Sequence, residues 1–159
     1  MLPRISRTAL SILWITVALT MVGCNRKTIY SRYQPTPLEG WEPNDRLTFS
    51  IEPMKTAGCY EEIVGLRTTS DYPFMRLTLI VEQELFPTHQ LMVDTIDVPI
   101  VDEDGAILGN GVSTFQYTFP LRRLDLNQGD SLLVSIHHFM KRELLPGISD
   151  VGFTVARHQ

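Results

Sequence analysis

Two adjacent histidines are the first candidates for metal chemistry in this sequence. Neutral imidazole is a common zinc ligand, so His137-His138 deserves a test against known ligand spacings. The flanking residues alternate as in a β-strand, and neighbours on a strand point to opposite faces of the sheet. Neither a His-Glu-x-x-His pattern nor paired Cys and His spacing surrounds the two residues. The pair is therefore interpreted as structural, and no metal site is predicted.

An acidic run suggests a cation loop. Asp102-Glu103-Asp104-Gly105 resembles part of an EF-hand loop, which needs alternating oxygen ligands before the glycine and a glutamate six residues after it. Ile100 and Gly111 occupy two of those places. Asp-Gly between two apolar runs is instead typical of a hairpin. We predict a hairpin turn here.

The remaining motifs for catalysis and cofactor binding are incomplete. Gly109-Asn110-Gly111 lacks the third glycine and the following helix of a dinucleotide loop. Residues 111–115 lack the second glycine of a nucleophile elbow. The sequence therefore predicts no catalytic residue and no cofactor, and a hydrolase is the least favoured class.

Cys24 has the clearest chemical context in the chain. Arg4 and Arg7 precede an almost wholly apolar stretch, residues 9–22, which at roughly 14 residues is too short to span a bilayer but fits a signal peptide. Gly23 immediately precedes the cysteine, as in the lipobox that lipoprotein signal peptidase cleaves, although Met21 replaces the usual leucine. We predict that the Cys24 thiol receives a diacylglyceryl group and that Cys24 becomes the mature N-terminus. Two or more acyl chains give a stable membrane anchor.

Composition limits the rest of the chain to one globular domain. Removal of residues 1–23 from the 159-residue chain leaves 136 residues and takes the formal charge from −4 to −6, because Arg4 and Arg7 are lost. An acidic domain is not typical of a nucleic-acid-binding protein. With 43% hydrophobic and 20% charged residues, the chain is ordinary for a folded protein.

The expected organisation has three parts. Residues 1–23 form the signal peptide, residues 24–44 a lipidated tether rich in proline, and residues 45–159 the folded domain. Tyr30 and Tyr33 are unusual in a linker, which leaves open that part of the tether packs on the domain as an edge strand.

Period-two alternation dominates the domain and predicts an all-β fold. Leu47, Phe49 and Ile51 alternate with polar residues, and Pro99 indicates an edge strand or a bulge. Cys59 begins a strand and is interpreted as a buried structural thiol. The architecture predicted is a single β-sandwich, for which a jelly-roll strand order is one option. The expected strands cover residues 45–52, 59–69, 75–82, 91–101, 112–121, 131–141 and 148–157.

Several short motifs, in this order and spacing, resemble the gliding-motility lipoproteins called GldH, from Bacteroidetes. The resemblance covers nearly all of the mature chain. Its carriers are Gly23-Cys24, Trp41 with the four residues after it, residues 66–74 with their Tyr72-Pro73 step, Asp94-Thr95, the glycines Gly105, Gly109 and Gly111, and residues 140–152 with Leu145-Pro146-Gly147. Tyr72-Pro73 and Leu145-Pro146-Gly147 are interpreted as fold determinants, because proline and glycine set the local backbone geometry.

The resemblance implies a membrane-anchored, noncatalytic accessory component of gliding motility and the linked type IX secretion machinery, with envelope proteins as partners. Members also occur in species that do not glide. Asn25, Arg26 and Lys27 supply no acidic residue after Cys24, which in lipoproteins of this type favours the periplasmic face, so the outer membrane is the expected location. Basic residues there would also lie next to anionic headgroups.

A second class of function is a ligand- or glycan-binding β-sandwich of the cell envelope. Such a module needs exposed aromatic rings that form a platform for a sugar. Trp41, Tyr30, Tyr33 and Tyr117 are the candidates, and their burial discriminates between a binding module and an assembly lipoprotein.

Overall fold

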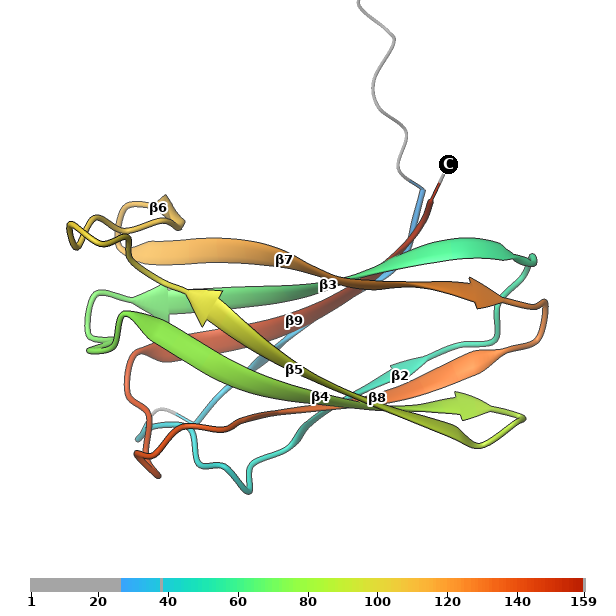
Figure 1. The fold of residues 1–159 in the computed structure, drawn as a ribbon, viewed down its shortest axis with the longest axis horizontal. Coiled ribbons are helices and arrows are strands. Elements are labelled where there is room, and N and C mark those ends of the chain that lie inside the picture. The colour runs from blue at the N-terminus through green and yellow to red at the C-terminus, as the bar shows by residue number, and fades with distance from the viewer. Residues whose placement is uncertain (1–26, 38, 159) are drawn as a thin grey trace, which may run out of the picture.

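The computed structural model describes residues 27–37 and 39–158, and this part of the chain is built from nine β-strands in two antiparallel sheets. The sheets pack face to face (Figure 1). No helix in the described part has the length and apolar character needed to cross a bilayer. The predicted all-β sandwich is confirmed, whereas the predicted signal peptide and Cys24 lie outside the described residues.

The first sheet has five strands in the order β1-β9-β3-β7-β6. Its long central strands carry the alternating residues that the sequence predicted, and β6 is a two-residue strand on the β7 edge. The strands are β1 (Thr28–Pro35), β9 (Ile148–Arg157), β3 (Gly58–Thr69), β7 (Thr114–Leu126) and β6 (Asn110–Gly111).

The second sheet has four strands in the order β2-β8-β4-β5. Strand β5 lies at its edge and ends at Pro99, so the edge placement inferred from that proline is confirmed. The strands are β2 (Leu47–Ile51), β8 (Ser131–His138), β4 (Arg76–Phe86) and β5 (Gln90–Pro99).

Consecutive strands mostly alternate between the sheets. Strands β1, β3, β7 and β9 belong to one sheet and β2, β4 and β8 to the other, while β4 and β5 form a hairpin within the second sheet. This connectivity is the jelly-roll order that the sequence left open. Almost every neighbouring strand pair therefore joins residues that are distant in the sequence.

The core lies between the two sheets and follows the period-two pattern. On β2, Leu47, Phe49 and Ile51 are buried while Thr48 and Ser50 are exposed. The rings of Phe49 and Phe153 approach across the sandwich with centroids 6.1 Å apart. Each such side chain contributes roughly 1.5–3 kcal/mol when it is removed from water. Burial of alternate residues thus fixes which face of β2, and of the other strands that carry this pattern, points inward.

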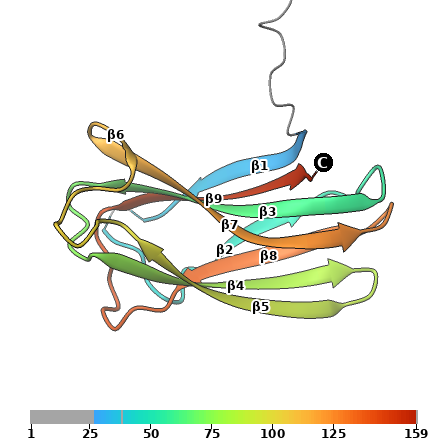
Figure 2. The same cartoon turned by 45° about the horizontal axis from the view of Figure 1, so that its top comes forward.

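The connections between the strands lie at the two ends of the sandwich (Figure 2). The proximal end holds the start of β1, the end of β9 and the three short connections 52–57, 87–89 and 127–130. The distal end holds the other connections: 36–46, which includes the undescribed residue 38, 70–75, 100–109 and 139–147. Strand β7 has 13 residues, so the two ends are about 43 Å apart.

The segment predicted as a tether contains a strand. Strand β1 pairs with β9 from Thr28↔Ala156 to Pro35↔Asp150, with one register shift between Thr28 and Tyr30. Its backbone groups are therefore satisfied by the sheet, which an extended tether would leave to water. The edge strand that Tyr30 and Tyr33 suggested is confirmed, and the folded domain begins well before residue 45.

Two side-chain expectations are wrong. Met75 is 54% exposed, because β4 begins one residue later and Met75 belongs to the distal connection. Cys59 is a free, half-buried thiol rather than a core residue. Its neighbour Tyr60 is buried, so Cys59 faces the outer surface of the first sheet.

Candidate functional site

The two histidines lie at the end of β8, and their side chains are buried on opposite faces of the sheet as predicted. His138 faces the core, where its Nε2 lies 3.0 Å from the carbonyl oxygen of Trp41, and its ring meets the Trp41 ring edge-on. Burial lowers the pKa of both histidines. In the described residues, no group of three or more His, Cys, Asp or Glu side chains could hold a metal ion.

The acidic run forms the predicted hairpin turn. Val101 pairs with Ile107 across it, and Gly105 has a φ of +84°, a conformation that favours glycine. The Asp102 carboxylate accepts hydrogen bonds from the backbone N–H groups of Asp104 (3.0 Å) and Ala106 (2.8 Å). This carboxylate therefore stabilises the turn itself.

A buried polar cluster between the sheets was missed in the sequence. Glu62 on β3 and Gln83 on β4 are both buried, and Gln83 Nε2 donates a 2.9 Å hydrogen bond to Glu62 Oε2. Arg122 on β7 pairs with Asp94 on β5 at the same edge of the sandwich. For Glu62, Gln83 and Asp94 the signal was present in the alternation, because each occupies an inward position of its strand. Arg122 is brought inward by a register shift in the pairing of β3 with β7, which strict alternation along β7 does not predict.

The buried position of Glu62 favours its neutral, protonated form. Burial raises its pKa to about 7, against the opposing effects of the Gln83 hydrogen bond and the Arg122 charge. Its second oxygen, Oε1, and Gln83 Oε1 have no hydrogen-bond partner among the described atoms. A protonated Glu62 carries an O–H donor that an ionised one lacks. Because the side chain is fully buried, this acid is out of reach of a substrate.

Most of the family-like motifs gather at the distal end, whereas Asp94-Thr95 lies within β5 and Gly23-Cys24 is outside the described residues. Trp41 is fully buried, exchanges 2.9 Å backbone hydrogen bonds with Leu145, and donates its indole N–H to the Asp45 carbonyl at 2.7 Å. Two of the four distal connections are thereby joined. The tryptophan is a structural anchor for these loops.

Gly147 joins a third connection to the same group. Its carbonyl accepts a 2.8 Å hydrogen bond from the Thr69 N–H, and its φ is +78°. A Cβ on this residue would lie 2.3 Å from the Tyr72 nitrogen. The Tyr72 hydroxyl in turn donates to the Arg76 carbonyl at 2.9 Å. Tyr72-Pro73 and Leu145-Pro146-Gly147 thus contact each other, as expected of fold determinants.

The distal end also exposes apolar side chains. We use the name distal tip for six exposed residues at this end, of which five lie in its four connections and Val112 in the turn between β6 and β7: Met75, Ile107, Leu108, Val112, Phe139 and Leu144. They are more than half of the large exposed hydrophobic residues that the described chain carries. The hydrogen bonds of Trp41, Leu145 and Gly147 brace the connections 36–46, 70–75 and 139–147. The 100–109 connection is held separately, because the Met75 carbonyl accepts hydrogen bonds from the N–H groups of Ile100 (2.9 Å) and Val101 (3.3 Å).

The aromatic residues considered for a glycan platform are mostly buried or packed against the sheet. Trp41 and Tyr117 are buried. The Tyr33 ring lies against Gly65 and Gly152 on the outer face of the first sheet, with the Arg67 guanidinium carbon 4.1 Å from its centroid. Only Tyr30 and Tyr33 are partly accessible, and both stand beside an arginine.

The fold and the distal end define a jelly-roll β-sandwich that presents exposed apolar side chains at the end opposite the start of its N-terminal strand. The family of GldH lipoproteins matches over residues 28–155, and the chain belongs to this family. It is 26% identical over 148 residues to the gliding motility lipoprotein GldH of Flavobacterium johnsoniae, an alignment that covers 89% of this chain and 92% of that protein.

Solved structures with a similar arrangement of strands are distant. A GH115 4-O-methyl-α-glucuronidase, BtGH115A, is 15% identical with a TM-score of 0.46, and the alignment covers 86% of this chain but 18% of the enzyme. A family 35 carbohydrate-binding module from Clostridium thermocellum is 10% identical with a TM-score of 0.40, covering 79% of this chain and 87% of the module. The globular domain of zebrafish complement 1qA is 14% identical with a TM-score of 0.41, and the alignment covers 85% of this chain and 98% of that domain.

Proposed function

We propose that the protein is a noncatalytic accessory lipoprotein of the gliding-motility and type IX secretion machinery, anchored by acylated Cys24 to the periplasmic face of the outer membrane. The observation that carries the proposal is the position of the distal tip. It lies about 43 Å from the start of β1, the strand that follows the anchor, a separation set by the 13 residues of β7. A lipoprotein built in this way holds an apolar surface away from the membrane for a protein partner.

The partner surface and the absence of catalysis are supported by separate features. Large exposed apolar side chains at the end of a rigid domain suit a protein interface, whose core is depleted of charge. The one strongly perturbed acid of the described chain, Glu62, is inaccessible. A glycan-binding role lacks the open aromatic platform that it needs, since Trp41 and Tyr117 are buried.

Substitutions at the distal tip test the proposal in the native host. Phe139→Ser combined with Leu108→Ser should abolish the secretion of type IX cargo, and gliding where the organism glides. Abundance and membrane fractionation of the lipoprotein should be unchanged, because both side chains are exposed and their loss costs little stability. A crosslink from a photoreactive residue at Phe139 to a protein of the same machinery should disappear with the Leu108 substitution.

The matched control lies near the start of β5, the edge strand of the second sheet. Leu91 (74% exposed) and Val93 (64% exposed) form an apolar pair on β5, far from the distal connections. Leu91→Ser with Val93→Ser should leave secretion intact. If the tip variant functions normally, or the two double variants fail equally, the tip is not the partner surface.

A further inference from the structure

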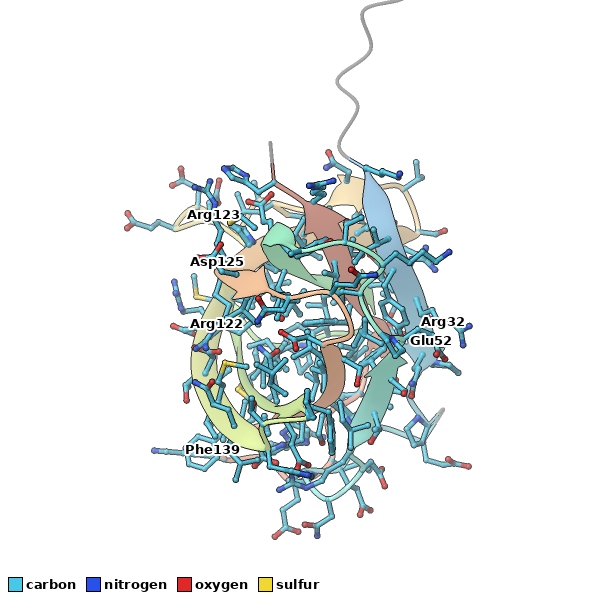
Figure 3. The ribbon with its side chains drawn as sticks, turned by 90° about the vertical axis from the view of Figure 1, so that its right-hand side faces the viewer. Arg32, Glu52, Arg122, Arg123, Asp125 and Phe139 are labelled. Carbon is cyan, nitrogen blue, oxygen red and sulfur yellow. The ribbon has the colours of Figure 1, made fainter. Side chains whose placement is uncertain are left out.

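A cleft opens at the proximal end between β1 and β2, the facing edge strands of the two sheets. Its volume is about 740 Å³, within the range of about 300–1,000 Å³ that holds small ligands. Buried side chains of Ile51, Met54 and Tyr60 are among its lining. Figure 3 looks onto this end of the molecule and shows Arg32 and Glu52 at the edge that β1 and β2 form.

The inward face of β1 is polar where the cleft opens. Arg32 is paired with Phe153 and Tyr30 with Val155, and both partners on β9 are fully buried. Paired residues on neighbouring strands share a face of the sheet, so Arg32 and Tyr30 face the interior. Their side chains are nevertheless not buried, because the two sheets separate at this edge. The sequence thus places an arginine where the rest of this face carries core residues.

The cleft is basic although the chain is acidic. Four cationic side chains line it, Lys27, Arg32, Lys55 and Arg157, against the single carboxylate of Glu52, whereas the whole chain has a formal charge of −4. Among the described residues, the ion pairs do not involve Lys27, Arg32 or Lys55. Hydroxyl groups of Tyr30, Ser50 and Thr56 add hydrogen-bond donors. This combination suits a phosphate group, which arginine and lysine bind through charge-assisted hydrogen bonds.

The location of the cleft indicates where such a phosphate would come from. Lys27 lies three residues after Cys24, so its Cα is at most about 11 Å from that of the acylated cysteine. The Lys27 carbonyl accepts a 3.0 Å hydrogen bond from the Arg157 N–H, which fixes the start of β1 to the end of β9. The basic cleft is therefore held within reach of the headgroups around the anchor, a step that rests on the proposed acylation of Cys24.

We propose that the cleft between β1 and β2 binds the phosphate-bearing headgroup of an anionic membrane lipid. The acyl chains on Cys24 hold the protein at one point, about which the domain could turn. A lipid headgroup bound by Arg32 and Lys55 in the cleft gives the domain a second point of attachment to the membrane. Together they direct the proximal end to the membrane and the distal tip away from it.

Native mass spectrometry of the full-length acylated protein in detergent tests this site. Phosphatidylglycerol should be retained on the wild-type protein and phosphatidylcholine should not. Arg32→Gln with Lys55→Gln should weaken retention of phosphatidylglycerol roughly tenfold or more, since each cation near an anionic headgroup contributes about fivefold. Both residues are exposed and outside the ion pairs, so the melting curve should not change.

The matched control removes the same two charges at the other end of the molecule. Lys141→Gln with Arg142→Gln, both exposed in the 139–147 connection, should bind phosphatidylglycerol as the wild type does. Equal losses in both double variants would mean nonspecific charge attraction and overturn the proposal. Equal retention of phosphatidylcholine, or displacement of the lipid by inorganic phosphate at equal concentration, would also overturn it. The same spectra report the acyl mass on the protein, so a missing anchor is distinguished from an empty cleft.

Discussion

Gln83 on β4 donates a 2.9 Å hydrogen bond to Glu62 on β3, and this bond joins the two sheets in the interior of the sandwich. The carboxyl group is removed from water on every side, and burial raises its pKa to about 7. In the unfolded chain the same group has its ordinary pKa of 4.5. The native protein therefore holds a proton on Glu62 at pH values where the unfolded chain has lost it.

This difference predicts a pH-dependent stability. Between pH 4.5 and about 7 the native state binds more protons at Glu62 than the unfolded state does. The contribution of Glu62 to the free energy of unfolding is therefore complete below pH 4.5 and is lost as the pH rises to about 7. The loss amounts to about 3 kcal/mol at roughly 1.4 kcal/mol per pKa unit. The lowered pKa values of His137 and His138 act in the opposite direction. Their deprotonation favours the native state, so these two groups add stability as the pH rises.

Glu62→Gln isolates the effect. The amide stays neutral at every pH, so the difference in unfolding free energy between variant and wild type should change by about 3 kcal/mol from pH 4.5 to pH 8. Urea unfolding at a series of pH values measures it. Glu103→Gln on the exposed 100–109 connection is the matched control and should follow the wild type throughout. A constant difference across that range would mean that Glu62 is ionised in the native protein.

Much of the fold was predictable because burial acts on alternate residues. Leu47, Phe49 and Ile51 reveal β2 directly, and Asp104-Gly105 reveals the turn after β5. Strand β1 was predicted only as an alternative, because its inward residues are Tyr30, Arg32 and Gln34, which line an open edge instead of the core. Where a strand's inward face is polar, the period-two signal is lost.

The candidate sites were less predictable for a different reason. Jelly-roll pairing is long-range, so the contact of Gly147 with Tyr72, 75 residues apart in the chain, has no local signature. Glu62 looks like an ordinary surface residue until its alternation with Tyr60 and Val64 is counted. Similarity to a family identified the distal motifs in the sequence. That they lie together at one end became evident only from the strand order in the structure.

Gly152 is predicted to be coupled to Tyr33. A Cβ on Gly152 would lie 2.7 Å from the Tyr33 ring, so Gly152→Ala must push the ring off the sheet. We expect a loss of about 1–2 kcal/mol in the wild-type background. In a Tyr33→Ala background the same substitution should be neutral or slightly stabilising, because alanine restricts the unfolded chain more than glycine does. Thermal melting of the four proteins measures the coupling.

A matched glycine separates this contact from the effect of the residue type. Gly58, also in the first sheet, would place a Cβ 3.4 Å from the Arg157 side chain, an ordinary contact distance. Gly58→Ala should therefore change stability by less than about 0.5 kcal/mol. Equal costs for Gly152→Ala with and without the Tyr33 ring would show that the ring is not the obstacle.

Gly147 at the distal end is predicted to be highly sensitive to substitution. Its φ of +78° already disfavours a side chain by about 1 kcal/mol, and a Cβ would lie 2.3 Å from the Tyr72 nitrogen and 2.6 Å from its Cα. Backbone atoms cannot swing away as a side chain can, so Gly147→Ala should cost more than about 3 kcal/mol. Gly129, with φ +93° and nothing within 4 Å of its Cβ position, is the control. If both alanine variants melt at the same temperature, the close approach of Gly147 to the Tyr72 backbone does not affect stability.

Cys24 and Cys59 give opposite predictions for the same substitution. Only a thiol forms the thioether that carries the diacylglyceryl group, so Cys24→Ser should remove the acyl mass and leave residues 1–23 uncleaved. Cys59→Ser should retain acylation and processing. Its thiol is free and half-buried on the outer face of β3, so stability should change by less than about 0.5 kcal/mol.

The anchor prediction extends to function because the folded domain begins at β1, directly after the cysteine. The domain contains nine strands within residues 28–157, so it should remain folded in the Cys24→Ser protein and keep its melting curve. Secretion and gliding should nevertheless fall sharply, because the proximal end is no longer held at the correct membrane. Mass spectrometry of the mature N-terminus and membrane fractionation provide the measurement. A wild-type protein that begins at another residue, or carries no acyl mass on Cys24, would contradict the anchor on which the orientation of the whole domain depends.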